Sequence, residues 1–161
     1  MESVEVQEAE LYYKQCREQR VQARIKLDDE EARKQAEFPG DDRSLFIVYE
    51  EHASRMRDLK AELSAAEKRE NEAKEMLRQA QEREAAAFEA EMQRLKSSNN
   101  GRETRESEQL RLDREKDLQY RQDRAANYDW SEQIAMNKAA YAREDLIRSA
   151  YREHDNDGRG R

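Results

Sequence analysis

The sequence contains few of the residues that turn or cross-link a chain. It has one proline, four glycines and one cysteine in 161 residues. A single cysteine excludes a disulfide bond within the chain and is typical of proteins in a reducing compartment. Because glycine and proline are the strongest local signals for turns, their scarcity predicts few turns and long regular elements.

Large apolar residues are also scarce. Leu, Ile, Val and Phe together account for 22 of the 161 residues, which is less than a packed globular core usually requires. No apolar run approaches the length of a membrane-spanning helix, and the acidic start at residues 1–5 does not resemble a signal peptide. We therefore expect no membrane insertion and a location in the cytoplasm or on the cytoskeleton, with an internally targeted mitochondrial protein as the alternative.

Charged residues fill the space that apolar residues leave. They make up 43% of the chain, and the net charge of −7 arises from 31 basic and 38 acidic side chains that are interleaved. Binding to nucleic acid or to an anionic membrane surface usually requires a basic stripe. Since no segment provides one, we predict neither nucleic acid nor membrane as the main partner.

The most abundant residues are strong helix formers. Ala, Glu, Lys, Arg and Leu together supply 89 of the 161 residues, and the β-branched runs that strands require are absent. The composition therefore predicts an all-α chain of long, extended helices. We expect a coiled-coil rod with two or three breaks and no globular core, similar to generic coiled-coil structural proteins.

Two clusters of turn-forming residues divide the chain. Pro39-Gly40 marks the first, and Ser97 to Gly101 form the second. Residues 127–131 fit either a weaker break or a continuous helix. The resulting prediction is an N-terminal helix over 1–38, a Pro-Gly turn at 39–42, a long helix over 43–96, a turn at 97–102, a helix over 103–154 and a polar tail at 155–161.

The segment 43–96 has the clearest heptad pattern. One seam position contains Leu45, His52, Leu59, Ala66 and Ala73, and the other contains Tyr49, Met56, Leu63, Glu70 and Leu77. An insertion of four residues after Leu77 would continue the seam through Phe88, Met92 and Leu95. The second half of the seam is rich in alanine, which buries little area. The pattern therefore predicts no strong homodimer and favours docking of this helix on a larger protein.

Aromatic and aliphatic residues concentrate in the last third of the chain. They are Tyr128, Trp130, Ile134, Met136, Tyr141, Ile147 and Tyr151. Such residues often anchor a protein interface, although this helix could instead fold back on the middle one. We predict contacts with partner proteins at Leu45, Tyr49, Met56, Leu59, Leu63, Leu77, Phe88, Trp130, Ile134, Tyr141, Ile147 and Tyr151.

Residues 146–160 carry the one recognisable motif. An apolar helix pattern with Ile147 and Tyr151 leads into Asp155-Asn156-Asp157-Gly158-Arg159-Gly160. This segment resembles the entering helix and the first half of the loop of an EF-hand. The resemblance assigns Asp155 and Asp157 to the first and third ligand positions and Gly160 to the sharp turn.

The motif departs from the EF-hand at the loop positions that provide further calcium ligands. Arg159 stands at the fifth position, where the family has an oxygen ligand, and the sequence ends before the glutamate of the twelfth position. Asp155 and Asp157 are therefore weak candidates as metal ligands, and we expect no bound metal or cofactor. The alternative interpretation is a helix that ends in a polar tail containing glycine.

No constellation of residues indicates catalysis. Cys16 could in principle pair with His52 or His154, but the three lie on different predicted helices with nothing to enclose a substrate. One cysteine and two histidines do not form a zinc site with the usual spacing, and the glycines do not form a phosphate-binding loop. We therefore expect that the chain is not an enzyme.

Three functions remain as hypotheses. The first is a structural or tethering subunit that lies along a large protein assembly, with a cytoskeletal filament such as the microtubule of a cilium or flagellum as the setting. The second is an accessory subunit of a large enzyme complex, for example a mitochondrial respiratory complex. The third is a calcium-responsive adaptor that uses the partial EF-hand.

Overall fold

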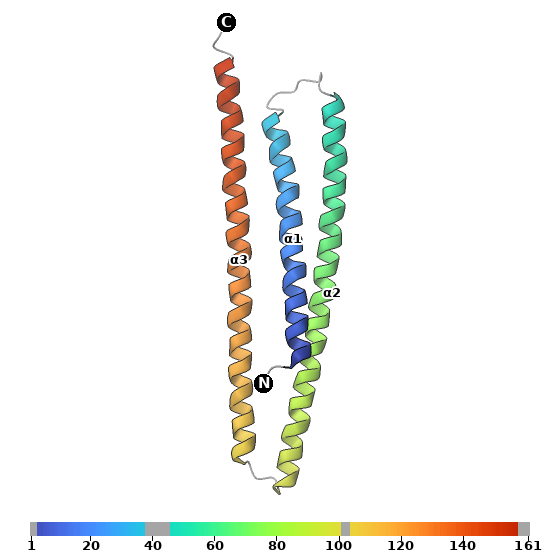
Figure 1. Ribbon diagram of the computed structural model, residues 1–161, viewed down its shortest axis with the longest axis vertical. Helices are drawn as coiled ribbons and strands as arrows, with labels where there is room; N and C mark the ends of the chain where they lie inside the picture. The colour runs from blue at the N-terminus through green and yellow to red at the C-terminus, as the bar shows by residue number, and fades with distance from the viewer. Residues whose placement is uncertain (1–2, 38–45, 101–103, 158–161) are drawn as a thin grey trace. The chain divides into compact units, whose positions relative to one another are not determined.

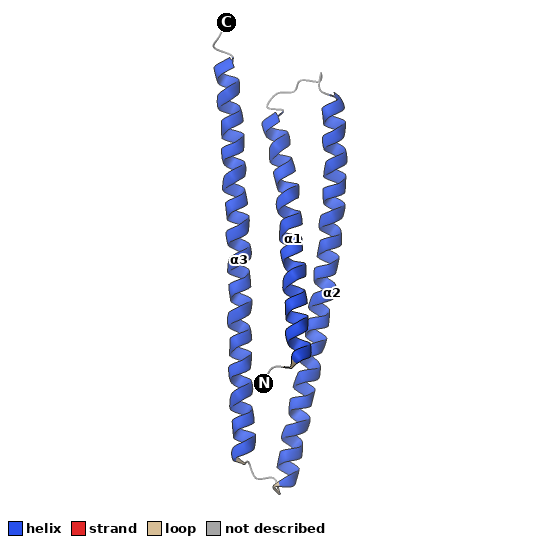
Figure 2. Ribbon diagram, viewed as in Figure 1, coloured by secondary structure: helices blue, strands red, loops and turns tan. Residues whose placement is uncertain are grey.

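Three long helices make up the part of the chain that is described. The computed structural model describes residues 3–37, 46–100 and 104–157, and these contain α1 (Val4–Glu37), α2 (Phe46–Ser98) and α3 (Arg105–Asp157) (Figures 1 and 2). Among these residues no segment forms a strand, so the predicted all-α class is confirmed. The Pro39-Gly40 turn lies outside the described residues, and α3 continues without a break through 127–131.

Side-chain capping explains where α1 and α3 begin. Before α3, the Ser107 amide donates to Thr104 Oγ1 at 3.4 Å and the Thr104 amide donates to Ser107 Oγ at 3.0 Å. Before α1, the Val6 amide donates to Ser3 Oγ at 3.3 Å. Each contact satisfies an amide that has no partner inside the helix, which is the usual role of an N-cap residue.

The end of α2 is formed by two asparagines. The Asn99 side-chain amide donates to the Leu95 carbonyl oxygen at 3.0 Å, and the Asn99 main-chain amide donates to the Lys96 carbonyl oxygen at 3.3 Å. Asn100 has a φ of 52°, in the left-handed region that asparagine tolerates better than most other residues. These contacts end the helix within the cluster of turn formers that the sequence predicts at 97–102.

The chain divides into two compact units, each containing a segment of all three helices. Unit 1 consists of Met1–Cys16 and Arg69–Trp130, and unit 2 consists of Arg17–Lys68 and Ser131–Arg161.

In unit 1, the start of α1 packs against the second half of α2. Val6, Ala9 and Ala80 form a buried cluster, against which Leu77 is partly buried. Glu5 of α1 forms an ion pair with Arg83 of α2 beside this cluster. The small side chains of Ala9 and Ala80 allow the two helices to approach closely without large apolar residues.

In unit 2, α1 and the first half of α2 run antiparallel. Lys26 pairs with Glu62, whereas Lys34, which is further along α1, contacts Tyr49, which is earlier in α2. The opposite directions of the two helices can be followed in Figure 1. Between these contacts lies a second buried cluster, which consists of Ala23, Leu27, Leu63 and Ala66, with Met56 and Leu59 partly buried against it.

The expectation of helices without a core is not confirmed, because the helices pack against one another within each unit. The heptad seam of α2 is the side that contacts α1 in both clusters. His52, Leu63, Ala66, Ala73 and Ala80 are buried there. The alanines that predicted weak self-association therefore pack inside the chain.

Candidate functional site

Helix α3 packs differently from α1 and α2. The buried hydrophobic residues and both apolar clusters belong to α1 and α2, whereas the buried residue of α3 in the described part of the chain is Ser107. The half-buried side of α3 combines charged residues, among them Arg121, Arg124, Glu132 and Arg143, with apolar ones, among them Tyr128, Met136 and Ile147. Ion pairs are nevertheless a prominent part of the contacts of α3 with α1 and α2.

In unit 1, both ion pairs and cation–π contacts attach α3 to the other helices. Lys14 Nζ of α1 lies 5.1 Å from the centre of the Tyr128 ring, and the guanidinium of Arg114 lies 4.5 Å from the centre of the Phe88 ring of α2. Arg121 Nη2 lies 2.6 Å from Glu84 Oε2 of α2, and Arg124 Nη2 lies 2.7 Å from Glu10 Oε2 of α1. Glu84 also accepts the main-chain amide of Ser3 at 2.7 Å. Burial raises the pKa of Glu84, but the bonds from Ser3 and Arg121 outweigh it and lower the pKa below its ordinary value.

In unit 2, Glu132 is the acidic end of the α3 contact. Its two carboxylate oxygens accept Arg17 Nε at 2.6 Å and Arg20 Nη2 at 2.7 Å, both from α1. Burial raises the pKa of Glu132, but the bonds from the two arginines outweigh it and the pKa is lowered. Glu132 therefore remains ionised in the folded chain at neutral pH.

Arg143 is the basic end of the same contact. Its guanidinium donates from Nε to Asp29 Oδ1 at 2.8 Å and lies 3.5 Å from Asp28 Oδ2. It also reaches the main-chain oxygen of Ile25 at 3.4 Å. Since Arg17 pairs with Glu132 and the later Asp29 pairs with Arg143, α1 and α3 run parallel in unit 2.

Two large apolar residues of α3 in unit 2 lie away from this contact, whereas Met136 and Ile147 are half-buried on the side of Glu132 and Arg143. Ile134 is 50% exposed and Tyr141 is 70% exposed. Each lies two residues from a charged contact residue, Glu132 or Arg143, which is about 200° of rotation around a helix. Ile134 and Tyr141 are seven residues apart and share one side, which we name the Ile134–Tyr141 face. Leu146 and Tyr151 are also exposed on this segment.

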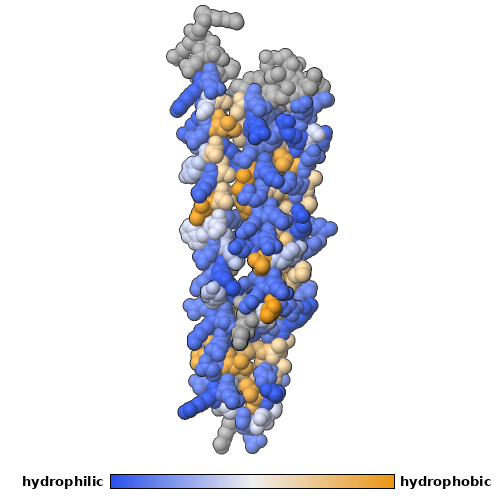
Figure 3. Space-filling view, viewed as in Figure 1, coloured by the Kyte–Doolittle hydropathy of each residue, from blue (hydrophilic) through white to orange (hydrophobic). Residues whose placement is uncertain are grey.

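Unit 1 shows the same exposure of apolar residues on α3. Trp130, the last residue of unit 1, is 69% exposed, and Tyr120 and Leu118 are also exposed. On the face of the molecule in Figure 3, hydrophilic residues predominate and hydrophobic residues form separate patches.

The structure divides the predicted partner-binding residues into two groups. Leu63 is buried, and Met56, Leu59, Leu77, Phe88 and Ile147 are half-buried. Tyr49, Trp130, Ile134, Tyr141 and Tyr151 are exposed, and Leu45 lies outside the described residues. The exposed group is thus available to another protein, whereas the half-buried and buried group is engaged within the chain.

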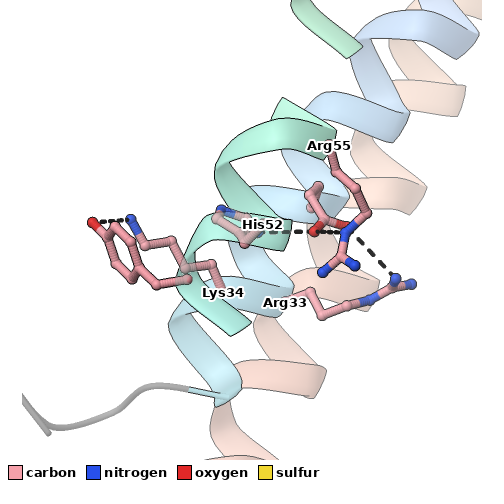
Figure 4. A network of polar contacts seen from close by, with 6 residues as sticks. Arg33, Lys34, His52 and Arg55 are labelled. Atoms are coloured by element: carbon pink, nitrogen blue, oxygen red, sulfur yellow. Dashed lines mark hydrogen bonds and ion pairs between the residues drawn. The ribbon is translucent and has the colours of Figure 1, made fainter. Parts of the chain in front are cut away.

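A buried ionic network crosses from α1 to α2 in unit 2 (Figure 4). Glu30 and His52 are each 5% exposed. Glu30 Oε1 lies 2.8 Å from both His52 Nδ1 and Arg55 Nε, and Arg33 lies 3.6 Å from Glu30 Oε2. A carboxylate can only accept, so His52 Nδ1 carries the shared hydrogen when Glu30 is ionised. Burial raises the pKa of Glu30, but the bonds from Arg55 and His52 lower it overall.

Lys34 and Tyr49 form a second contact between the same helices, closer to the end of α1. Lys34 Nζ donates to Tyr49 Oη at 3.2 Å and lies 4.6 Å from the centre of the ring (Figure 4). The contact combines a hydrogen bond with a cation–π interaction. It keeps Tyr49 against α1 although half of its surface is exposed.

The EF-hand-like segment is described only in part. The main chain of α3 remains helical through Asp157, but the side chains of Asp155 and Asp157 lie outside the described residues. The side chains that are described contain no group of three His, Cys, Asp or Glu that could hold a metal ion. Over the same part of the chain, no helix has an apolar stretch long enough to cross a membrane.

Sequence reasoning missed the charged residues that attach α3. Glu132, Arg143, Arg17 and Asp29 are surrounded in the sequence by many similar side chains, so none of them stands out. The sequence feature that indicates this side of α3 is the pair Ala135 and Ala139. These alanines lie between Glu132 and Arg143 at helical spacing, and their small side chains allow another helix to approach.

Comparison of the chain with known protein families, curated proteins and solved structures found no match.

Proposed function

We propose that the chain is a non-catalytic structural or tethering subunit that binds a larger protein assembly through α3. The observation that carries this proposal is the exposure of Ile134 and Tyr141 on a helix whose other side contacts α1 through Glu132 and Arg143. In an ordinary amphipathic helix the apolar side would be buried. An exposed aromatic residue with an aliphatic neighbour is the kind of anchor that protein interfaces use.

The length of the helices supports the same proposal. A helix of 53 residues, such as α2 or α3, extends about 80 Å at about 1.5 Å per residue. Such a helix can contact several neighbouring subunits of an assembly along one side. The mixture of charges on the surface adds solubility and specificity more than affinity.

The setting that we propose first is a cytoskeletal filament, with the microtubule of a cilium or flagellum as the case to test. An accessory role in a large enzyme complex, such as a mitochondrial one, is the alternative. Microscopy of a tagged full-length chain distinguishes the two, because staining along filaments supports the first and staining of mitochondria supports the second.

The test changes the Ile134–Tyr141 face without touching the contacts of α3 with α1. The full-length chain with Ile134→Ser and Tyr141→Ser is expressed in cells, and its sedimentation is compared with that of the wild type. The wild type is expected to sediment with a large assembly and to form chemical crosslinks from the exposed Lys138, which lies between the two positions. The variant is expected to sediment mainly as the free chain.

Leu11→Ser is the matched control, because Leu11 is an exposed aliphatic residue on α1. It should sediment like the wild type. If the Ile134→Ser, Tyr141→Ser variant also remains with the assembly, this face is not the binding site. A wild-type chain that sediments in cells as a free monomer would refute the proposed function itself.

A further inference from the structure

The contact between α1 and α3 in unit 2 has the features of an exchangeable helix-binding site. At one end Arg17 and Arg20 hold Glu132, and at the other end Asp28 and Asp29 hold Arg143. Glu132 and Arg143 are eleven residues apart, which is close to three helical turns and places them on one side of the helix. The α1 surface therefore recognises a helix by one carboxylate and one guanidinium at a fixed spacing.

The middle of this contact contains small and medium-sized apolar residues. Between its charged ends α3 presents Ala135, Met136 and Ala139, which are half-buried, and α1 contains the buried Val21. The apolar cluster of unit 2 consists of α1 and α2 residues. Removing α3 from this site would therefore break its ion pairs and its own apolar contacts but leave the apolar cluster between α1 and α2 in place.

The ion pairs are partly exposed to solvent. The side chains of Arg17, Glu132 and Arg143 retain 19%, 23% and 16% of their surface, and Asp29 retains 49%. Salt screens such partly exposed contacts less than fully exposed ones, but it weakens them more than it weakens apolar packing. The contact is therefore specific because of its charge pattern and sensitive to ionic strength.

We infer that this α1 surface is a second protein-binding site, which α3 occupies in the free chain and which a helix of a partner protein enters by displacing it. The partner helix carries an acidic residue and an arginine eleven residues apart, with alanine-sized residues and one residue of the size of methionine between them on the same side. Its acidic residue pairs with Arg17 and Arg20, and its arginine pairs with Asp28 and Asp29. The inference goes beyond the proposed function, because it concerns the opposite side of α3 from the Ile134–Tyr141 face.

The test uses a peptide of residues 131–157 of this chain as the probe, because it carries the required pattern. Wild-type α3 competes with the peptide at a high effective concentration. The full-length chain is therefore given the substitutions Glu132→Arg and Arg143→Glu, which turn the ion pairs of its own α3 into repulsions. Binding of a fluorescent peptide is measured by anisotropy, and helicity by circular dichroism.

The charge-reversed chain is expected to bind the wild-type peptide at least roughly tenfold more tightly than it binds a peptide with the same two reversals. It should also bind the peptide more tightly than the wild-type chain does. The matched control chain carries Glu144→Arg and Arg148→Glu, which reverse an exposed ion pair within α3. This control should bind no better than the wild type.

Equal affinity for the two peptides, or no binding of either, would overturn the inference. A second measurement applies to the wild-type chain even if the charge-reversed chain does not fold. When salt is raised from about 50 to about 500 mM, which strongly screens exposed charges, amide hydrogen exchange should accelerate in residues 131–157. It should remain slow around Leu27 and Leu63, and equal acceleration in all three helices of unit 2 would refute separate release of α3.

A second copy of the chain could also supply the entering helix. Analytical ultracentrifugation of the wild-type chain tests this occupant. A concentration-dependent dimer that Glu132→Arg abolishes would show that α3 is exchanged between copies, and the inference of a different partner protein would then be wrong.

Discussion

Leu63→Ala tests whether the heptad seam of α2 stabilises the isolated chain or is buried only when a partner protein binds. Leu63 is 8% exposed and belongs to the buried cluster with Ala23, Leu27 and Ala66. If this packing holds the isolated chain together, the substitution must lower its free energy of unfolding. If the seam requires a partner for burial, the isolated chain should barely respond.

The size of the effect follows from the atoms removed. Leucine to alanine deletes three carbon atoms, each contributing about 0.8 kcal/mol when buried, or about 2.4 kcal/mol in total. A residual cavity would add to this cost. The alanines around Leu63 are too short to fill the space, whereas the partly buried Met56 and Leu59 can shift toward it. We therefore expect a loss of about 2–3 kcal/mol.

The measurement is urea unfolding of the purified chain, followed by far-ultraviolet circular dichroism. Ile134→Ala serves as the comparison, because Ile134 is half exposed and its truncation should cost less than about 1 kcal/mol. The reasoning is wrong if Leu63→Ala lies within about 0.5 kcal/mol of the wild type while the helicity is preserved. That outcome would restore the original expectation of helices that need a partner for their stability.

Three further predictions concern capping and ionisation. Thr104→Ala should cost about 1 kcal/mol and accelerate hydrogen exchange in the first turn of α3. The folded-state pKa values of Glu30 and Glu132 lie below their unfolded values. The stabilisation that the two carboxylates give is therefore present above the ordinary glutamate pKa and is lost as the pH falls through the folded value. In Glu30→Gln, the free energy of unfolding measured with urea should decrease less steeply as the pH falls. The pKa of Glu75, lowered to about 2 by its bonds from Arg78, should return toward its ordinary value in Arg78→Gln, as measured by NMR.

The sequence was sufficient to predict the helices and the packed side of α2. Alternating steps of four and three residues connect His52, Met56, Leu59, Leu63 and Ala66, and this spacing defines one side of a helix whatever it packs against. The polar clusters that end α2 and begin α3 were visible in the same way, because capping depends on neighbouring residues. These features are local, so the sequence alone shows them.

The orientation of α3 could not be predicted, because it depends on charges in distant parts of the chain. The usual rule places Ile134 and Tyr141 inside. However, α1 presents Arg17 and Asp29 toward α3, and covering these charges with apolar side chains would leave them without partners at high cost. Pairing them with Glu132 and Arg143 avoids that cost. Each pair joins residues more than a hundred positions apart, so no local pattern indicates it.

Buried Glu30 also pairs with residues of another helix, but its contacts determine the register of α1 and α2 and not the orientation of α3. Removing one partner of a buried ionic network leaves an uncompensated charge, which usually costs more than the network itself contributes. Glu30, His52 and Arg55 therefore restrict the pairing of α1 with α2 to registers that keep all three together.

Unit 2 thus combines two kinds of attachment that respond to different conditions. The pairing of α1 with α2 depends on apolar burial around Leu63 and on the enclosed Glu30, both of which salt weakens little. The pairing of α1 with α3 depends on the partly exposed contacts of Glu132 and Arg143, which salt weakens more. A partner that competes for those charges can therefore release α3 while the hairpin of α1 and α2 remains folded, and a partner on the Ile134–Tyr141 face can bind with α3 in either position.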